Sequence, residues 1–111
     1  RATTWTGKIG LMYPSDYAYA VDLSLCTKDG YNYDNSTCKS NDWLYLGIYE
    51  WTIMPYSSYA YHAFRVFSTG YVIYYDVSST YAARPVLYLK SDVTIIEGEG
   101  TSSNPYTLGT T

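Results

Sequence analysis

The sequence is poor in histidine, phenylalanine and charge, and it has no long apolar run. Only one of its 111 residues is histidine and two are phenylalanine, and 15% are charged. Seven basic residues against ten acidic ones give a net charge of −3, which argues against a surface that neutralises nucleic-acid phosphates. No stretch approaches the roughly 20 apolar residues that a membrane-crossing helix needs. The composition therefore excludes nucleic acid as an expected partner and a membrane-spanning segment.

Motifs for catalysis are missing too. His62 is the single histidine, so there is no metal-binding histidine pair, and no Gly-x-Ser-x-Gly segment is present. Asp76 could pair with Glu50 or Asp92 as the two carboxylates of a hydrolase, but the spacing favours neither pair. We therefore expect a non-enzymatic protein that has no catalytic residues, no metal and no cofactor.

Cys26 and Cys38 are the only cysteines, and eleven residues rich in turn formers separate them. No Cys-x-x-Cys motif or second histidine completes a zinc site, which leaves a disulfide or two free thiols. We predict the disulfide, which would stabilise the fold by about 3 kcal/mol through lost chain entropy. It also indicates an environment outside the reducing cytosol.

The segment between the cysteines has two further features. Residues 29–35 cluster oxygen ligands as calcium loops do, but they lack the bidentate glutamate of such loops, so we expect a solvated loop. Asn35 begins an Asn-Ser-Thr glycosylation sequon.

Hydrophobic patterning predicts a strand and a helix in the first part of the chain. Residues 9–13 form a short apolar run typical of a buried strand, and Ser15 is a good helix N-cap. Helical spacing then relates Tyr17, Ala20, Val21, Ser24 and Leu25.

The second part of the chain is strand-like. We predict strands over 50–54, 64–67, 71–75 and 86–90, with Ser68-Thr69-Gly70 as a hairpin turn and residues 97–106 as loop. In the last strand, Leu87 and Leu89 would face the core. The expected class is α+β: one domain over 1–111, with a strand–helix unit followed by a twisted antiparallel sheet with long loops.

Tyrosine is abundant, with 16 residues, and two groups of them are distinct. We expect packing to account for Tyr13, Tyr17, Tyr45 and Tyr88. A second group lies with Ser and Ala in segments 56–62 and 78–83, a composition typical of antibody paratopes. Tyr74 and Asp76 share one face of their strand, and both segments could converge on it. The predicted ligand-binding residues are Tyr56, Ser57, Ser58, Tyr59, Tyr61, His62, Tyr74, Asp76, Ser78, Ser79 and Tyr81. The alternative is that these tyrosines pack the sheet and cap its edges.

Several motifs resemble known families. Leu-Met-Tyr-Pro-Ser-Asp-Tyr-Ala-Tyr-Ala at 11–20 is similar to a stretch of formylglycine-generating-enzyme-like domains, whose fold is C-type-lectin-like. Trp51, Pro55, Gly70 and the Arg-Pro-Val at 84–86 resemble a bacterial surface domain, although Thr-Ile-Met stands where that domain has Leu-Arg-Ser. Two segments resemble C-terminal domains of pilin-like proteins of Gram-positive gut bacteria. They are Gly-Lys-Ile-Gly-Leu-Met-Tyr-Pro-Ser-Asp-Tyr at 7–17 and Arg-Pro-Val-Leu-Tyr-Leu-Lys at 84–90. The Tyr/Ser segments are similar to variable regions of diversity-generating-retroelement proteins.

These resemblances imply a C-type-lectin-like domain on a bacterial surface structure, without the catalytic cysteines of the formylglycine-generating enzymes. We expect no signal peptide at residues 1–5 and regard the chain as the C-terminal part of a longer precursor. The expected function is extracellular recognition or adhesion, with a protein or glycan as the ligand. The alternative is a pilin-like or fibre subunit that self-assembles through tyrosine contacts.

Overall fold

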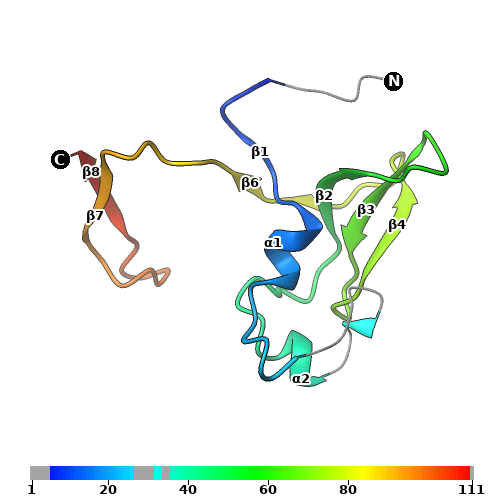
Figure 1. Ribbon diagram of the computed structural model, residues 1–111, viewed down its shortest axis with the longest axis horizontal. Coiled ribbons are helices and arrows are strands. Elements are labelled where there is room, and N and C mark those ends of the chain that lie inside the picture. Colours follow the sequence, from blue (N-terminus) through cyan, green and yellow to red (C-terminus); the bar gives the residue numbers. More distant parts are fainter. Residues whose placement is uncertain (1–5, 27–31, 34–35, 111) are drawn as a thin grey trace.

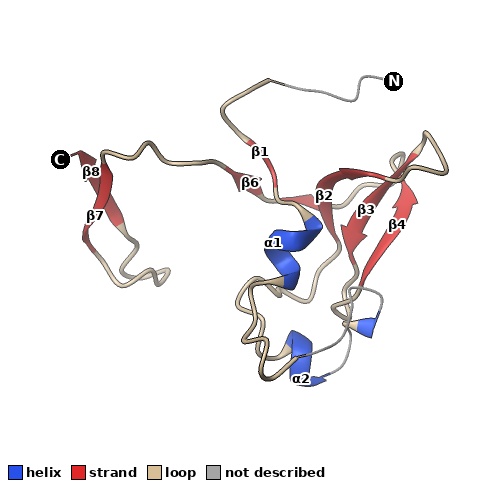
Figure 2. Ribbon diagram, viewed as in Figure 1, coloured by secondary structure: helices blue, strands red, loops and turns tan. Residues whose placement is uncertain are grey.

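Short strands dominate the structure, which is a computed structural model describing residues 6–26, 32–33 and 36–110. Its elements are β1 (Gly10–Leu11), α1 (Pro14–Ala18), α2 (Ser36–Lys39), β2 (Glu50–Pro55), β3 (His62–Val66), β4 (Val72–Asp76), β5 (Ala82–Ala83), β6 (Pro85–Val86), β7 (Val93–Glu97) and β8 (Thr107–Thr110). The described part is of the α+β class (Figure 2). The sequon at Asn35 and most of segment 29–35 lie outside the described residues.

The central sheet has the strand order β4-β3-β2-β5. β3 pairs antiparallel with both β2 and β4, whereas β5 runs parallel to β2. Gly70 turns the chain between β3 and β4 with a φ of 113°, and the Phe67 N–H donates to the Tyr71 carbonyl across the turn at 2.7 Å. The predicted hairpin is therefore confirmed, including the positive φ that favours glycine.

The helix α1 is shorter than the predicted one and begins earlier. Its N-cap is Tyr13, not Ser15, because Pro14 occupies the first helical position and the Asp16 carboxylate accepts a hydrogen bond from the Tyr13 N–H at 2.8 Å. The helical pattern ends before Asp22, whose carboxylate accepts from the Ser24 N–H at 2.8 Å and forms a separate turn. The predicted helix is therefore divided into α1, which ends at Ala18, and this later turn.

The face predicted for that helix is nevertheless partly correct. Tyr17, Ala20 and Val21 are buried, whereas Leu25 is exposed. Tyr17 and Val21 join a core against one face of the central sheet. The core consists of Met12, Tyr17, Val21, Cys26, Tyr33, Cys38, Val66 and Val72. The disulfide between Cys26 and Cys38 is confirmed, and both half-cystines are buried in this core.

Polar groups inside the core are paired. The Tyr17 hydroxyl donates to the Gly70 carbonyl at 2.6 Å, which ties α1 to the β3–β4 turn. The Tyr33 hydroxyl donates to Asp42 Oδ2 at 2.8 Å, and the Leu44 N–H donates to Asp42 Oδ1 at 2.8 Å. Burial raises the pKa values of Tyr17, Tyr33 and Asp42 because it disfavours their charged forms.

The C-terminal part differs from the predicted strand at 86–90. β6 ends at Val86, and Leu87 and Leu89 are 57% and 52% exposed instead of facing the core. Beyond them the chain forms the hairpin β7–β8, which the sequence analysis missed, while the predicted loop between Glu97 and Tyr106 is largely present. Figure 1 shows this hairpin standing away from the rest of the molecule, joined to it by an extended segment. Alternation alone could not reveal that no described element covers residues 87–89.

Removing the disulfide should weaken the fold. We expect the double substitution C26A/C38A to lower the free energy of unfolding by about 2–4 kcal/mol, because the unfolded chain regains the entropy of the closed loop. Urea denaturation of the variant and of the oxidised wild type measures the difference. Equal stabilities would contradict the structural role given to this bond.

Asp42 should make stability depend on pH. Its folded-state pKa lies above the ordinary value of 3.8, so the folded protein holds more protons than the unfolded chain between the two values. Its stabilising contribution is therefore fully present below pH 3.8 and is lost as the pH rises through the folded-state pKa. We expect the stability of wild type relative to D42N to fall between pH 3.5 and 7 in urea denaturation. A difference that stays constant over this range would contradict the assignment.

Candidate ligand-binding surface

Six aromatic side chains meet at the end of the central sheet, beyond the region that α1 covers. This tip cluster consists of Tyr56, Tyr59, Tyr61, His62, Phe64 and Tyr74, which lie in the β2–β3 connection, on β3 and on β4. Backbone bonds shape the connection, since the Tyr56 N–H donates to the His62 carbonyl at 3.0 Å and the His62 N–H donates to the Tyr59 carbonyl at 3.1 Å. The tight connection therefore holds the tyrosines close to one another.

The rings form two layers: a packed floor of Tyr56, His62, Phe64 and Tyr74, and an outer layer of Tyr59 and Tyr61. Tyr56 stacks on Tyr74 with 3.9 Å between ring centroids, and Phe64 meets Tyr56 edge-on at 5.6 Å. Tyr59 and Tyr61 lie 5.2 Å and 4.7 Å from the His62 ring. They are 48% and 55% exposed, so two tyrosine rings face solvent while the rings below them hold their positions. Such contacts add about 0.5–1.5 kcal/mol per pair beyond burial.

Polar groups surround these rings. Ser57 and Ser58 are exposed in the connection, and Ser78 is exposed after β4, whereas Ser79 is half-buried. The Val77 N–H donates to the Tyr61 carbonyl at 2.9 Å, which holds the segment after β4 against the tip. The tip therefore combines tyrosines with serines on one surface, as predicted for segment 56–62.

His62 and Asp76 lie side by side as cross-strand partners of β3 and β4. Hydrogen bonds from the Ser78 N–H, at 2.8 Å, and from its hydroxyl lower the pKa of Asp76, and the neighbouring His62 lowers it further. His62 Nδ1 is buried without a hydrogen-bond partner among the described residues. Asp76 is therefore an acceptor at the edge of the tip cluster.

Tyr81 does not join the tip, so the predicted convergence of the two segments is only partial. Its ring stacks on Tyr49 at 5.0 Å and lies 5.0 Å from Trp51, on the opposite face of the sheet. The parallel pairing of β5 with β2 places Tyr81 there, because Ala82 lies beside Glu50. Alternation along the strands then separates Tyr81 from the core-side rings.

Tyr81 belongs instead to a cage around Arg65, which the sequence analysis missed. The guanidinium carbon lies 4.1 Å from the ring centroid of Tyr75, 4.7 Å from Tyr81, 4.8 Å from Tyr49 and 4.9 Å from Phe67. Arg65 is only 4% exposed, and its Nε and Nη1 have no hydrogen-bond acceptor among the described residues. The aromatic faces therefore replace water around this cation. Alternation of Arg65 with Phe64 and Val66 was the available signal, since it places the arginine on the face opposite the core.

The carboxylates considered for a hydrolase are not brought together as a pair. Glu50 is buried and accepts a hydrogen bond from Arg84 Nε at 3.1 Å. It pairs with Val66 at one end of β3, whereas Asp76 pairs with His62 at the other end. Asp92 lies between β6 and β7, outside the central sheet. In residues 6–26, 32–33 and 36–110, no three His, Cys, Asp or Glu side chains are grouped as metal ligands.

None of the helices in the described part of the chain combines the length and apolar character needed to cross a bilayer. Comparisons of the sequence with protein-family models and with curated proteins, and of the structure with solved structures, gave no significant match. The candidate surface therefore rests on its own geometry.

The Arg65 cage should not accept lysine. An ammonium group lacks the flat faces that stack between rings, and it needs hydrogen-bond acceptors that this site does not offer. We expect R65K to lower the free energy of unfolding by about 2 kcal/mol, measured by urea denaturation. The matched control K90R, at an exposed position, should leave stability unchanged. A wild-type value for R65K would show that the cage tolerates any cation.

Proposed function

We propose that this chain is a non-enzymatic recognition domain of C-type-lectin-like fold that acts outside the cell on a bacterial surface structure. It binds a protein or glycan ligand through the tip cluster. The observation that carries this proposal is the half-exposure of Tyr59 and Tyr61 on a floor of packed rings. Tyr59 and Tyr61 stack on the ligand, and the serines and Asp76 hydrogen-bond to it.

The packed floor favours binding because it reduces the entropy lost when a ligand is held. Tyr56 and Tyr74 are already stacked at 3.9 Å, and the outer rings contact His62 before any ligand arrives. Preorganised aromatic side chains contribute large contact areas with few rotatable bonds. Passive packing explains the floor, but it does not explain why two tyrosines remain half exposed above it.

The serines and Asp76 complement these rings. Ser57 and Ser58 are exposed beside the rings, and Ser78 follows Asp76. A hydroxyl both donates and accepts, whereas the ionised carboxylate only accepts, so the tip offers both hydrogen-bonding roles. The hydrogen bonds from Ser78 keep Asp76 ionised at neutral pH and fix its position. Such a surface matches the hydroxyl-rich face of a sugar or the backbone of a peptide.

The fold and the location are supported by coarser features. The disulfide is typical of proteins outside the reducing cytosol. β1 pairs with β6, so the beginning of the domain lies beside a much later strand, and α1 covers one face of a sheet with long connections. These features are compatible with the lectin-like fold that the sequence motifs imply.

The alternative function is a structural fibre subunit in which the tyrosines contact neighbouring subunits. It makes a different prediction for the isolated chain, because self-association would then depend on Tyr59 and Tyr61. The recognition proposal instead predicts that removal of these two rings weakens binding of a ligand other than this chain.

We expect Y59A/Y61A to weaken capture on glycan and surface-protein arrays by more than tenfold, because both outer stacking rings are lost. The Y59F/Y61F variant should retain most of the binding, since it keeps the rings. Y19A is the matched control, as Tyr19 is an exposed tyrosine outside the cluster. The midpoint of thermal unfolding should stay close to that of wild type in Y59F/Y61F and Y19A. It should fall in Y59A/Y61A, which loses the ring contacts with Tyr56 and His62, so circular dichroism verifies that this variant is folded.

Tyr81 provides a second control on the opposite face. We expect Y81A to reduce thermal stability, because it opens the Arg65 cage, yet to leave ligand capture unchanged. Capture that survives Y59A/Y61A but is lost in Y81A would move the site to the opposite face and overturn the proposal.

A further inference from the structure

The hairpin β7–β8 has no sheet partner among the described residues of its own molecule. β7 and β8 pair with each other and with no other described strand, and Figure 1 shows them at the far end of an extended connection. The radius of gyration is 15.8 Å, against about 13 Å for a compact chain of this size. We call residues 91–110 the C-terminal arm. A lone two-stranded hairpin is marginally stable in water, so the arm requires a surface to pack on.

One face of the arm is apolar. The register pairs Ile95 with Leu108 and Val93 with Thr110, so Val93, Ile95 and Leu108 share a face. Ile95 is 58% exposed, and Leu108 is exposed too. Ile96 is equally exposed, at 61%, but its side chain lies over Gly109, next to Thr94 in the register, on the other face of the arm. Ile95 and Ile96 are therefore exposed on opposite faces of the arm.

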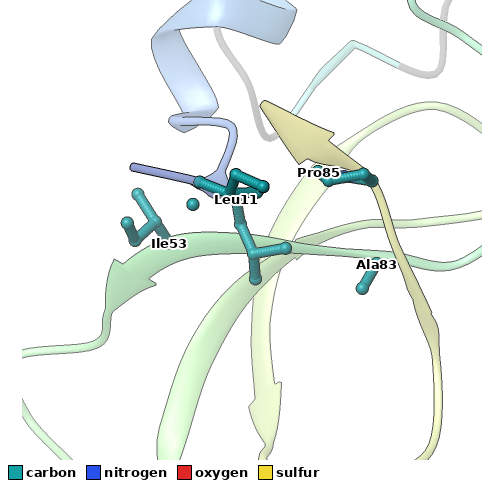
Figure 3. A pocket seen from close by; sticks show the side chains of 6 residues that line it. Leu11, Ile53, Ala83 and Pro85 are labelled. Atoms are coloured by element: carbon teal, nitrogen blue, oxygen red, sulfur yellow. The ribbon is translucent and has the colours of Figure 1, made fainter. Parts of the chain in front are cut away.

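The body of the molecule carries a matching apolar hollow. It measures about 530 Å³ and is lined by Ile9, Gly10, Leu11, Ile53, Ala83 and Pro85 from β1, β2, β5, β6 and the residue before β1. Figure 3 shows Leu11, Ile53 and Pro85 around it, without a charged side chain. Ile9 on its wall is more than half exposed, so no described segment of the chain fills this hollow.

The charges of the two parts are complementary. The arm contains Asp92, Glu97 and Glu99 and no lysine or arginine, so it accounts for the whole net charge of −3. The exposed Lys8 precedes Ile9 at the wall of the hollow. An acidic arm with an apolar face thus matches an apolar hollow with a basic residue at its edge.

We propose that the arm of one molecule packs into the hollow of a second copy of this chain, with Ile95 and Leu108 against Ile9 and Leu11. The arm does not reach the hollow of its own molecule. Pro85 in the wall lies just before residues 87–90, which are extended, contain no glycine and lead away from the hollow. The first turn after this segment, in which the Val93 N–H donates to the Lys90 carbonyl at 3.0 Å, comes only after the chain has led away from the hollow. A second copy supplies the same hollow without this constraint.

Sedimentation equilibrium of the 111-residue chain between 1 and 100 μM tests this proposal. We expect wild type to associate as its concentration rises, and I95E to remain monomeric, because a carboxylate would be buried in an apolar hollow. I9E, which changes the hollow, should also remain monomeric. The matched control I96E changes the neighbouring residue on the other face and should associate like wild type.

Mixing the two defective variants adds a sharper measurement. I95E retains an intact hollow and I9E retains an intact arm, so an equimolar mixture should form a mixed dimer with one contact, weaker than the wild-type assembly. Circular dichroism verifies that each variant is folded. A wild-type chain that is monomeric at 100 μM, equal effects of I95E and I96E, or a mixture that stays monomeric would each overturn the proposal.

This contact is independent of the tip cluster. Y59A/Y61A should therefore leave self-association unchanged, and I95E should leave ligand capture by the tip unchanged except for the avidity that a dimer adds. The failure of one proposal can thus be distinguished from the failure of the other.

Discussion

The central sheet depends on a buried positive charge that has no acidic partner among the described residues. Arg65 in β3 lies between aromatic rings that come from β4, from the residue after β3 and from the residues before β2 and β5. Removing a guanidinium from water is costly, and here the electron-rich faces of four rings offset part of that cost. Each strand must therefore keep its register, because a shift by one residue would turn its ring to the other face.

The opposite face of the same sheet has a different arrangement, and this difference leaves the tip accessible. There the Tyr17 hydroxyl bonds to the Gly70 carbonyl and Arg84 pairs with Glu50, so the core is fixed at one end of β3. At the other end, Tyr56 and Tyr74 stack without a covering helix. One strand thus links a closed core, a cation cage and an open aromatic surface.

Local chemistry was predictable from the sequence, and contacts between distant segments were not. The turn at Gly70, the disulfide and the burial of Tyr17 follow from spacing and from the properties of single residues. The length of α1 depended on Asp22, whose side chain formed its own turn. Alternation along β3 places Arg65 on the face opposite the core, but the position of Tyr81 depended on the parallel pairing of β5 with β2, which no periodicity reveals. Segment 86–90 alternates like a strand, but burial of its apolar side needs a covering layer, and the described elements do not supply one.

That parallel pairing also orders the events of folding. The chain between β2 and β5 forms β3 and β4, and the contacts of the β3–β4 hairpin are local, so they form early. Ala82 and Ala83 reach β2 only after a long loop has closed, which costs more entropy. We therefore expect the Tyr81 ring to reach the guanidinium after Tyr75 has done so. We also expect the release of Tyr81 to be the first step of unfolding from this edge of the sheet.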